Sequence, residues 1–427
     1  MKINPLTSSS ISREGLEPLR HALPKGGWVN YFVDTHIDIV KIDFIFPAGS
    51  ALQQKRLQAT AAIRLVTEGT KQHSAREIAE FMDFRGIVIE KNIDEVSTTL
   101  TVYSLRRYLD DLLPLLREII VEAAYPEEEF RLYVDKRKQH LLGEMMRTSV
   151  VARNLFYERL YGSEHPLGQH AIPEDFDKLT VEDVRSFHRD YLKPEDATIV
   201  VGGNVDELLL ELFDKHFGDF ATSASSLSSI EIPSPSVDSA NLYTQIRHKL
   251  PGAVQNTLRV GRILPMRWND MDYARFMVLC TILGGYFGSR LMSNIREDKG
   301  YTYGIYSQTR ICRGSLLFSI MTDVASDVAD AALDEIMYEL RRLCDVPVGE
   351  EELELVKRCM LGDFMRSVDG VFERSERYVQ QMTAGIDESF TDNYFRAIDT
   401  VTPEELQHIA KQLLRPEELL IVNVGNC

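Results

Sequence analysis

The chain contains two copies of one segment. Residues 179–204 and 401–426 align without a gap, each residue of the first copy corresponding to one 222 positions later. Both copies predict a threonine-capped helix that stops before Lys-Pro or Arg-Pro and is followed by a buried strand. Identical residues include Thr180/Thr402, Glu182/Glu404, Leu192/Leu414, Pro194/Pro416, Ile199/Ile421, Gly203/Gly425 and Asn204/Asn426. The repeat predicts that one folding unit of roughly 200 residues occurs twice.

A Ser/Pro-rich stretch, residues 221–239, lies between the copies. Such a composition is typical of an extended, solvated linker. We therefore expect an N-terminal domain at 1–220 and a C-terminal domain at 240–427. Within each copy, strand-like segments such as 37–46 and 96–102 mix with helical periodicity, for example at 52–66, 109–123, 271–283 and 324–343. This mixture predicts an α+β layer domain in each half.

Charge and hydropathy exclude some functions. The formal charge of −17 argues against a general nucleic-acid binder, which needs a basic surface. No apolar stretch is long enough to predict a membrane span. Residues 1–23 lack the apolar core of a secretory signal, so we expect a cytoplasmic protein. One locally basic stretch could face an acidic partner or simply be a solvated strand face; it comprises Arg247, Lys249, Arg259, Arg262, Arg267 and Arg275.

The metal-binding residue types do not form a recognisable zinc motif. None of the five cysteines is close enough to another to form a CxxC pair, which favours reduced thiols that fill the core. None of the ten histidines pairs with another at i,i+4 on a helical pattern. We therefore expect no metal in this chain.

Several motifs resemble the pitrilysin/insulinase family of zinc metallopeptidases, which includes the mitochondrial processing peptidase. In the first half they are Pro47-Ala48-Gly49-Ser50, Glu68-Gly69-Thr70 with Ser74-Ala75-x-x-Ile78-Ala79, and His165-Pro166-Leu167-Gly168. In the second half they are Leu283-Gly284-Gly285, Ser289-Arg290-Leu291 and Arg296-Glu297-x-Lys299-Gly300-x-x-Tyr303. The resemblance covers nearly the whole chain. It implies two similar tandem α+β domains, each a mostly antiparallel sheet with helices on one face, that help to enclose an unfolded peptide.

The resemblance also locates a zinc site that this chain has lost. Active members carry His-x-x-Glu-His on a helix, where two histidines bind Zn²⁺ and the glutamate is the general base. The corresponding residues here are Thr60, Ile63 and Arg64. Glu144 lies near the place of the third ligand, 80 residues after Arg64. A lone carboxylate beside a cation does not hold zinc where three protein ligands are the norm.

Two hypotheses remain for Arg64 and Glu144. Their side chains could form an ion pair that replaces the metal bridge. Alternatively, they face solvent on unrelated sides of their helices. A third possibility is a separate metal site that uses some of His140, Glu144, His165 and His170.

Arg296 and Tyr303 match a functional pair of the family. The resemblance implies that they reach across the chamber, bind the substrate backbone and stabilise the oxyanion opposite the zinc. A guanidinium and a phenol are suitable donors for a developing negative charge. The alternative is a surface arginine and a core tyrosine with structural roles only.

The sequence therefore predicts a non-catalytic, substrate-binding subunit of a heterodimeric zinc endopeptidase that acts on short or unfolded peptides. A homologous partner chain with an intact His-x-x-Glu-His would supply the zinc and the general base. This chain would supply Arg296, Tyr303 and sheet edges to which a peptide can add as a strand. The alternative is an inactive structural or peptide-binding scaffold of the same fold.

Overall fold

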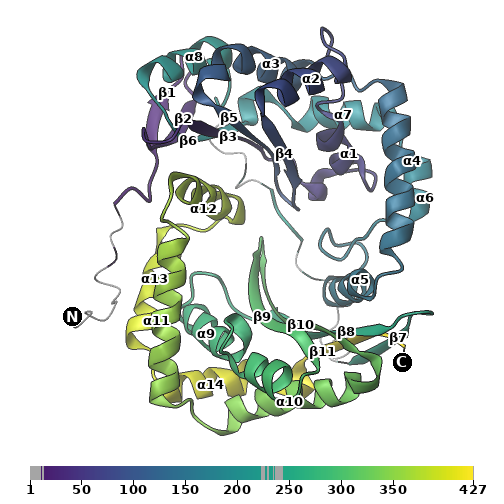
Figure 1. The fold of residues 1–427 in the computed structure, drawn as a ribbon, viewed down its shortest axis with the longest axis vertical. Coiled ribbons are helices and arrows are strands. Elements are labelled where there is room, and N and C mark those ends of the chain that lie inside the picture. The colour runs from purple at the N-terminus through teal and green to yellow at the C-terminus, as the bar shows by residue number, and fades with distance from the viewer. Residues whose placement is uncertain are drawn as a thin grey trace.

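Two β-sheets with matching strand order organise the molecule (Figure 1). The computed structural model describes residues 11, 14–222, 227, 230–233, 235 and 244–426. The first sheet has the order β1-β2-β6-β3-β5-β4 and the second β7-β11-β8-β10-β9. The first comprises β1 (Leu19–Ala22), β2 (Trp28–Val33), β3 (Ile39–Phe46), β4 (Val88–Ile93), β5 (Thr98–Leu105) and β6 (Thr198–Gly203). The second comprises β7 (Gln245–Lys249), β8 (Gln255–Leu264), β9 (Thr302–Cys312), β10 (Ser315–Ala325) and β11 (Leu420–Gly425).

The two sheets also share their strand directions. Strands β2 and β6 run parallel, as do β7 and β11, and the other strand pairs are antiparallel. The repeated segment supplies β6 to one sheet and β11 to the other. The predicted fold class, two similar and mostly antiparallel α+β units, is confirmed. The predicted domain boundaries stay a prediction, and most of the linker at 221–239 lies outside the described residues.

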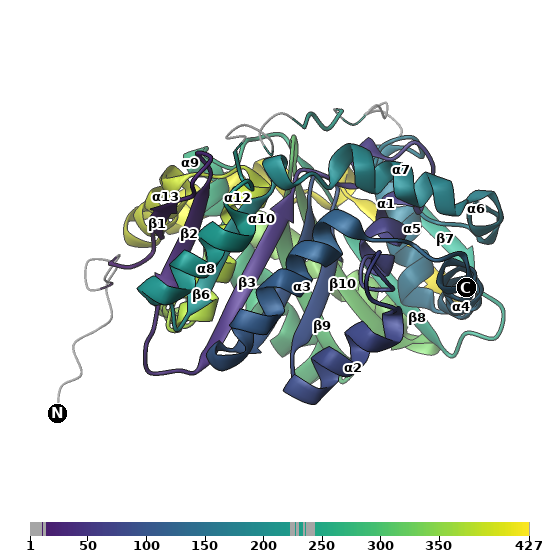
Figure 2. The same ribbon diagram turned by 90° about the horizontal axis from the view of Figure 1, so that it is seen from above.

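Helices cover the outer face of each sheet. Figures 1 and 2 show α3 and α8 over the first sheet, and Figure 1 shows α9, α10 and α14 beneath the second. In the first half the helices are α1 (Gln58–Leu65), α2 (Ala75–Arg85), α3 (Leu109–Glu122), α4 (Glu127–Glu144), α5 (Thr148–Tyr161), α6 (Pro173–Lys178), α7 (Val181–Tyr191) and α8 (Glu207–Phe217). In the second half they are α9 (Met271–Cys280), α10 (Ala329–Asp345), α11 (Glu350–Arg366), α12 (Val371–Ala384), α13 (Glu388–Thr400) and α14 (Pro403–Leu413).

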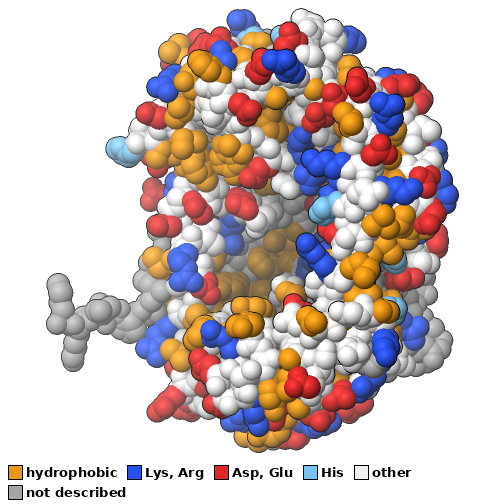
Figure 3. Space-filling view, turned by 45° about the vertical axis from the view of Figure 1, so that its right-hand side comes forward, with side chains coloured by type: hydrophobic (Ala, Val, Ile, Leu, Met, Phe, Trp, Pro, Cys, Tyr) orange, Lys and Arg blue, Asp and Glu red, His pale blue; other side chains and the backbone are white. Residues whose placement is uncertain are grey.

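One helix of each half crosses to the other half. Helix α5 packs against β11 and β8 of the second sheet, and α12 packs against β6 and β2 of the first. Figure 1 shows both helices on the inner faces of the sheets, at opposite ends of the molecule. Each half therefore covers part of the other's sheet, and the rest of the inner faces borders a hollow that is visible in Figure 3.

Strand periodicity separates the core from the inner face. In β3, Val40, Ile42 and Phe44 belong to the core beneath the outer helices. Lys41 and Asp43 alternate with them and therefore point to the inner face. This agrees with the strand that the sequence predicts at 37–46. No helix among the described residues combines the length and apolar composition needed to cross a bilayer.

Candidate functional site

The predicted zinc-site positions lie on α1 in a form that does not fit a metal. Ile63, at the general-base position, is buried in the apolar core of the first half. Arg64 is exposed and Thr60 is half-buried. Helix α1 packs beside the edge strand β4. None of Thr60, Ile63 and Arg64 offers an imidazole or a carboxylate, so these residues do not fit a zinc ion.

The surroundings of α1 are basic as well. The Lys91 ammonium donates to the backbone carbonyl of Arg64 at 2.9 Å and to Thr67 Oγ1 at 2.6 Å. Burial lowers the pKa of Lys91, the charge of Glu68 opposes this, and the charge of Arg64 adds to it. Arg64 also lies near the Tyr133 hydroxyl, whose pKa is raised by burial. Cations next to the lost site would repel Zn²⁺.

The expected Arg64–Glu144 ion pair is not found between these two described residues. The Glu144 carboxylate instead pairs with His140, one turn earlier on α4, at 3.2 Å. A partner at i,i+4 on the same helix needs no tertiary alignment, which is why it is preferred. Arg64 is therefore not the counter-ion of Glu144.

The separate metal site is not supported either. His165 donates from Nε2 to the Pro233 carbonyl at 2.8 Å, and His170 lies 3.8 Å from Glu158. In the described part of the chain, no group of three or more His, Cys, Asp or Glu side chains is arranged to hold a metal ion.

Arg296 and Tyr303 lie around an irregular edge of the second sheet. Arg296 is on a π-helical segment, Met292–Asp298, and its guanidinium lies 4.6 Å from the Phe287 ring centroid. Tyr303 is on the edge strand β9 and is 95% exposed. The β9–β10 register shifts between Thr322 and Val324, beside Tyr303. Bulges and π-helical turns often re-aim side chains at functional sites. Tyr303 is thus not the core residue of the alternative hypothesis, and the assigned role stays a prediction.

Phe287 is a contact that the sequence analysis missed. It is 61% exposed and supports the Arg296 guanidinium by a cation–π contact. The glycine motif that precedes it affects how closely two backbone segments pack. A Cβ on Gly284 would lie 2.6 Å from the Ser307 nitrogen of β9. Glycine at this position therefore permits a second π-helical segment, Thr281–Gly285, to approach the edge strand closely, rather than only ending a helix.

The motifs of the first half have structural roles. Ser50 and Ala51 donate backbone N–H groups to the carbonyls of Asp94 and Glu95, at 2.9 and 3.0 Å, and fix the turn between β4 and β5. His165 accepts a hydrogen bond from the Leu167 N–H at 3.0 Å. Its two ring nitrogens thus have opposite roles, one donating and one accepting, which describes a neutral imidazole. Burial lowers the pKa of His165 accordingly.

An ion pair joins the two halves at this turn. Glu95 lies 3.1 Å from the Arg310 guanidinium of β9. This pair links a residue of the first sheet's half to one of the second's. The Pro47–Ser50 motif therefore positions a contact between the halves, a role that no local sequence signal indicated.

The inner side of α5 carries a group of arginines that the sequence analysis did not identify as a site. Arg153 of α5, Arg259 of β8 and Arg310 of β9 surround Tyr157 of α5. The locally basic stretch is not one surface: Arg247 pairs with Asp330 and Arg275 with Glu405. Arg262 pairs with Glu418, and Arg259 lies on the inner face.

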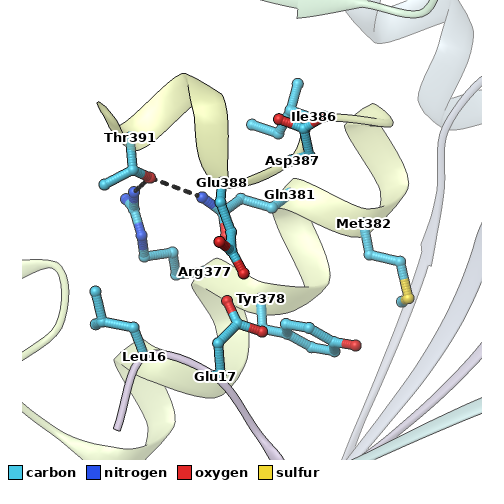
Figure 4. Close-up of a pocket in the computed structure, with 10 residues that line it drawn as sticks. All are labelled: Leu16, Glu17, Arg377, Tyr378, Gln381, Met382, Ile386, Asp387, Glu388 and Thr391. Carbon is cyan, nitrogen blue, oxygen red and sulfur yellow. Dashed lines mark hydrogen bonds between the residues drawn. The ribbon is translucent and has the colours of Figure 1, made fainter. Parts of the chain in front are cut away.

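One cavity, of about 390 Å³, lies beside α5, and another, of about 440 Å³, borders α12 (Figure 4). The Arg377 guanidinium donates to Thr391 Oγ1 at 3.0 Å and lies 4.6 Å from the Phe364 ring centroid. Figure 4 shows the carboxylates of Glu17 and Glu388 turned toward each other across it. Its charged lining is mainly acidic, in contrast to the cavity beside α5.

Comparison with known proteins finds a family model that matches part of the chain. Residues 178–360 match the family model described as "Peptidase M16 inactive domain". This segment is similar to that domain of the M16 peptidases. The predicted resemblance to the pitrilysin/insulinase metallopeptidases is therefore confirmed, and the matched region includes Arg296 and Tyr303.

Similar proteins span most of the chain. "Uncharacterized zinc protease YmxG" of Bacillus subtilis is 22% identical over 363 residues, which is 83% of this chain and 84% of that protein. "Non-peptidase homolog YmxG" of Helicobacter pylori is 19% identical and covers 90% of this chain and 88% of its own. The crystal structure of a peptidase M16 inactive domain from Pseudomonas fluorescens superposes with a TM-score of 0.81 at 19% identity, covering 96% of this chain and 98% of that one. At this identity the structural likeness shows the fold alone.

Proposed function

We propose that the protein is a non-catalytic, peptide-binding subunit that pairs with a homologous zinc peptidase. The observation that carries this is the contrast within the chain: α1 has lost every zinc-site residue, whereas Tyr303 stays almost fully exposed next to a bulge. A tyrosine with only a packing role would be buried. In this proposal the chain lies in the cytoplasm, its domains divide at 221–239, and zinc resides in the partner.

The sheet edges support peptide binding. Strands β4 and β9 end their sheets and pair on one side only among the described strands. An unpaired edge offers backbone donors and acceptors to an extended peptide, with little demand on its side chains. Edge β4 lies beside α1, where the resemblance places the former zinc site, and edge β9 carries Tyr303. A peptide strand added to either edge would therefore lie beside a position with a functional role in the family.

The test uses the chain co-purified with an M16 homologue from the same organism that keeps His-x-x-Glu-His. We expect the pair to cleave unfolded peptides and the isolated chain to cleave none. Arg296→Ala or Tyr303→Phe should lower kcat about a hundredfold, as loss of an oxyanion donor does. Arg76→Gln, which removes an exposed arginine on α2, is the matched control and should be neutral.

The alternative, a structural scaffold, predicts another result. In that case the two chains associate, but the variants at Arg296 and Tyr303 cleave as fast as the unsubstituted pair. Stoichiometric zinc in the isolated chain would contradict both proposals.

A further inference from the structure

Three guanidinium groups converge on one tyrosine at the inner side of α5. Arg310 donates to the Tyr157 hydroxyl at 3.5 Å. Arg259 lies close enough to Tyr157 and Arg153 for both to act on its charge. These side chains come from a helix of the first half and strands of the second, so the site exists only because α5 crosses over.

The local charges are not balanced. Arg310 has Glu95 as its partner. The Arg153 guanidinium has one hydrogen bond, to Asn154 Oδ1 at 3.4 Å. Arg259 donates to Met321 Sδ at 3.9 Å, and its Nε is buried without a hydrogen-bond partner among the described residues. Among the described residues, neither Arg153 nor Arg259 has a carboxylate within ion-pair distance.

This arrangement has a cost unless an anion binds. Like charges a few ångströms apart repel each other, more strongly where protein excludes water. Burial lowers the pKa of Arg259 and the charge of Arg153 adds to this, although Tyr157 and Asp323 oppose it. Because α5 and β8 are packed against each other, the two arginines cannot separate freely. An anion between them would relieve the repulsion.

A cavity of suitable size is present at this position. It has a volume of about 390 Å³ and lies between α4, α5, the loop at 166–171 and β9. Its polar lining includes Arg137, Arg153, Arg310, Asn154, Tyr157 and His170. The two carboxylates that also line it are already engaged, Glu95 by Arg310 and Glu144 by His140. Figure 3 shows Lys and Arg side chains at the margin of the hollow.

We propose that this cavity binds a carboxylate of the peptide held in the hollow, with Arg153 and Arg310 as the donors and Arg259 adding positive potential from behind Tyr157. The guanidinium fork matches a carboxylate in two parallel hydrogen bonds. The carboxylate can come from an Asp or Glu side chain or from the peptide's C-terminus. The inference rests on the proposed function and adds a preference for acidic or C-terminal segments.

The experiment measures binding of fluorescein-labelled peptides to the full chain by anisotropy. Four peptides of one sequence differ only in having Glu or Gln at the central positions and a free or amidated C-terminus. We expect the carboxylate-bearing peptides to bind at least about tenfold more tightly, with an affinity that falls as salt rises. Comparison of the Glu amide with the Gln free acid tells which carboxylate is bound.

Variants locate the site. Arg153→Gln should remove most of the preference for carboxylate, and Arg259→Met should weaken it while keeping the packing volume. Arg76→Gln removes the same formal charge from the outer helix α2 and should keep the preference. Circular dichroism checks that each variant is folded.

Other outcomes separate the two proposals. Equal binding of all four peptides overturns this inference and leaves the proposed function standing. A preference that Arg76→Gln lowers as much as Arg153→Gln also overturns it, since net charge rather than the cavity would then be responsible. Absence of binding by every peptide overturns both proposals.

Discussion

The two crossing helices are equivalent in the repeat but are held differently. Helix α5 contributes Ala152, Phe156, Leu160 and Tyr161 to a cluster with the second sheet, and all four are fully buried. Helix α12 buries only Val371 and Ser375. The first crossing is thus an aromatic, core-like contact, and the second is a thin one with a cavity on its outer side.

The sheet surface beneath each helix explains the difference. Under α5 lie Leu420, Val422 and Val424 of β11. Near α12 the inner face carries Lys41 and Asp43, which pair at 3.0 Å. Burial raises the pKa of Asp43, and the nearby Glu376 of α12 adds to this, although Lys41 and Thr101 oppose it. A buried ion pair of this kind adds little net stability. Helix α12 also makes apolar contacts, since Val371 clusters with Phe32, Ile45 and Val200, but the buried ion pair occupies part of the inner face near it.

The largest expected effect comes from removing the aromatic anchor of α5. Phe156→Ala should lower the free energy of unfolding by about 3–5 kcal/mol, because it leaves a cavity in a closely packed cluster. Val371→Ala, the matched change in α12, should cost roughly 2 kcal/mol. Urea denaturation of both variants measures the difference. Equal losses would contradict the distinction between the two crossings.

A pair of glycines sharpens the comparison. A Cβ on Gly261 would lie 2.1 Å from the Phe318 carbonyl and 3.0 Å from Phe156. A Cβ on Gly202 would meet only Ser375, at 3.1 Å, and the Val371 carbonyl at 3.4 Å. We expect Gly261→Ala to cost about 1–3 kcal/mol and Gly202→Ala less, since Ser375 can move.

A double-substitution cycle checks the second case. Ser375→Gly should recover the loss caused by Gly202→Ala, and it cannot recover that of Gly261→Ala. Recovery in both backgrounds would show that the loss is not local to the crossing helix.

The free energy of unfolding should depend on pH through a buried histidine near the end of α5. His165, which follows α5, has a pKa below the ordinary 6.5 because it is buried. The unfolded chain therefore takes up a proton before the folded one does as the pH falls below about 6.5, and stability is lost in that direction. Unfolding free energies at pH 7.5 and 5.5 should differ less in His165→Gln than in the unsubstituted chain. An unchanged difference would place the pH dependence elsewhere.

The smallest effect is expected at the ion pair between the halves. Glu95→Gln should change the free energy of unfolding by at most about 1 kcal/mol, because both partners are partly solvated. The same variant leaves Arg310 without its carboxylate, so it should strengthen binding of a carboxylate peptide while barely changing stability. Weaker binding would contradict that role of Arg310.

Local patterns predicted many of the elements. The strand-like segment at 37–46 contains β3, and the segment of helical periodicity at 109–123 contains α3. The predicted helix at 324–343 was wrong at its start, since Val324 still belongs to β10, which ends at Ala325, and α10 begins at Ala329. Apolar periodicity does not separate a strand end from a following helix when both are buried.

The sequence did not predict that α5 and α12 cross between the halves, or that arginines gather on the inner face. The sequence of α5 does not indicate which strands the helix packs against, because its apolar face suits either sheet. The strands that it contacts lie about a hundred residues or more away in the chain. Loss of zinc ligands could be found from a motif, since it depends on residue identity alone. The hypothesis of an Arg64–Glu144 ion pair was wrong because it depended on the directions of two side chains on different helices. His140 lies one turn from Glu144 on the same helix and pairs with it.

The reciprocal exchange of α5 and α12 has a historical consequence. Two identical copies of one repeat, each lending a helix to the other, would form a symmetric domain-swapped dimer. Joining them through a segment such as 221–239 turns a concentration-dependent association into one with a fixed effective concentration. Once joined, the halves no longer had to stay alike. The two inner faces now differ: one carries the arginines around Tyr157, and the other carries the buried Lys41–Asp43 pair.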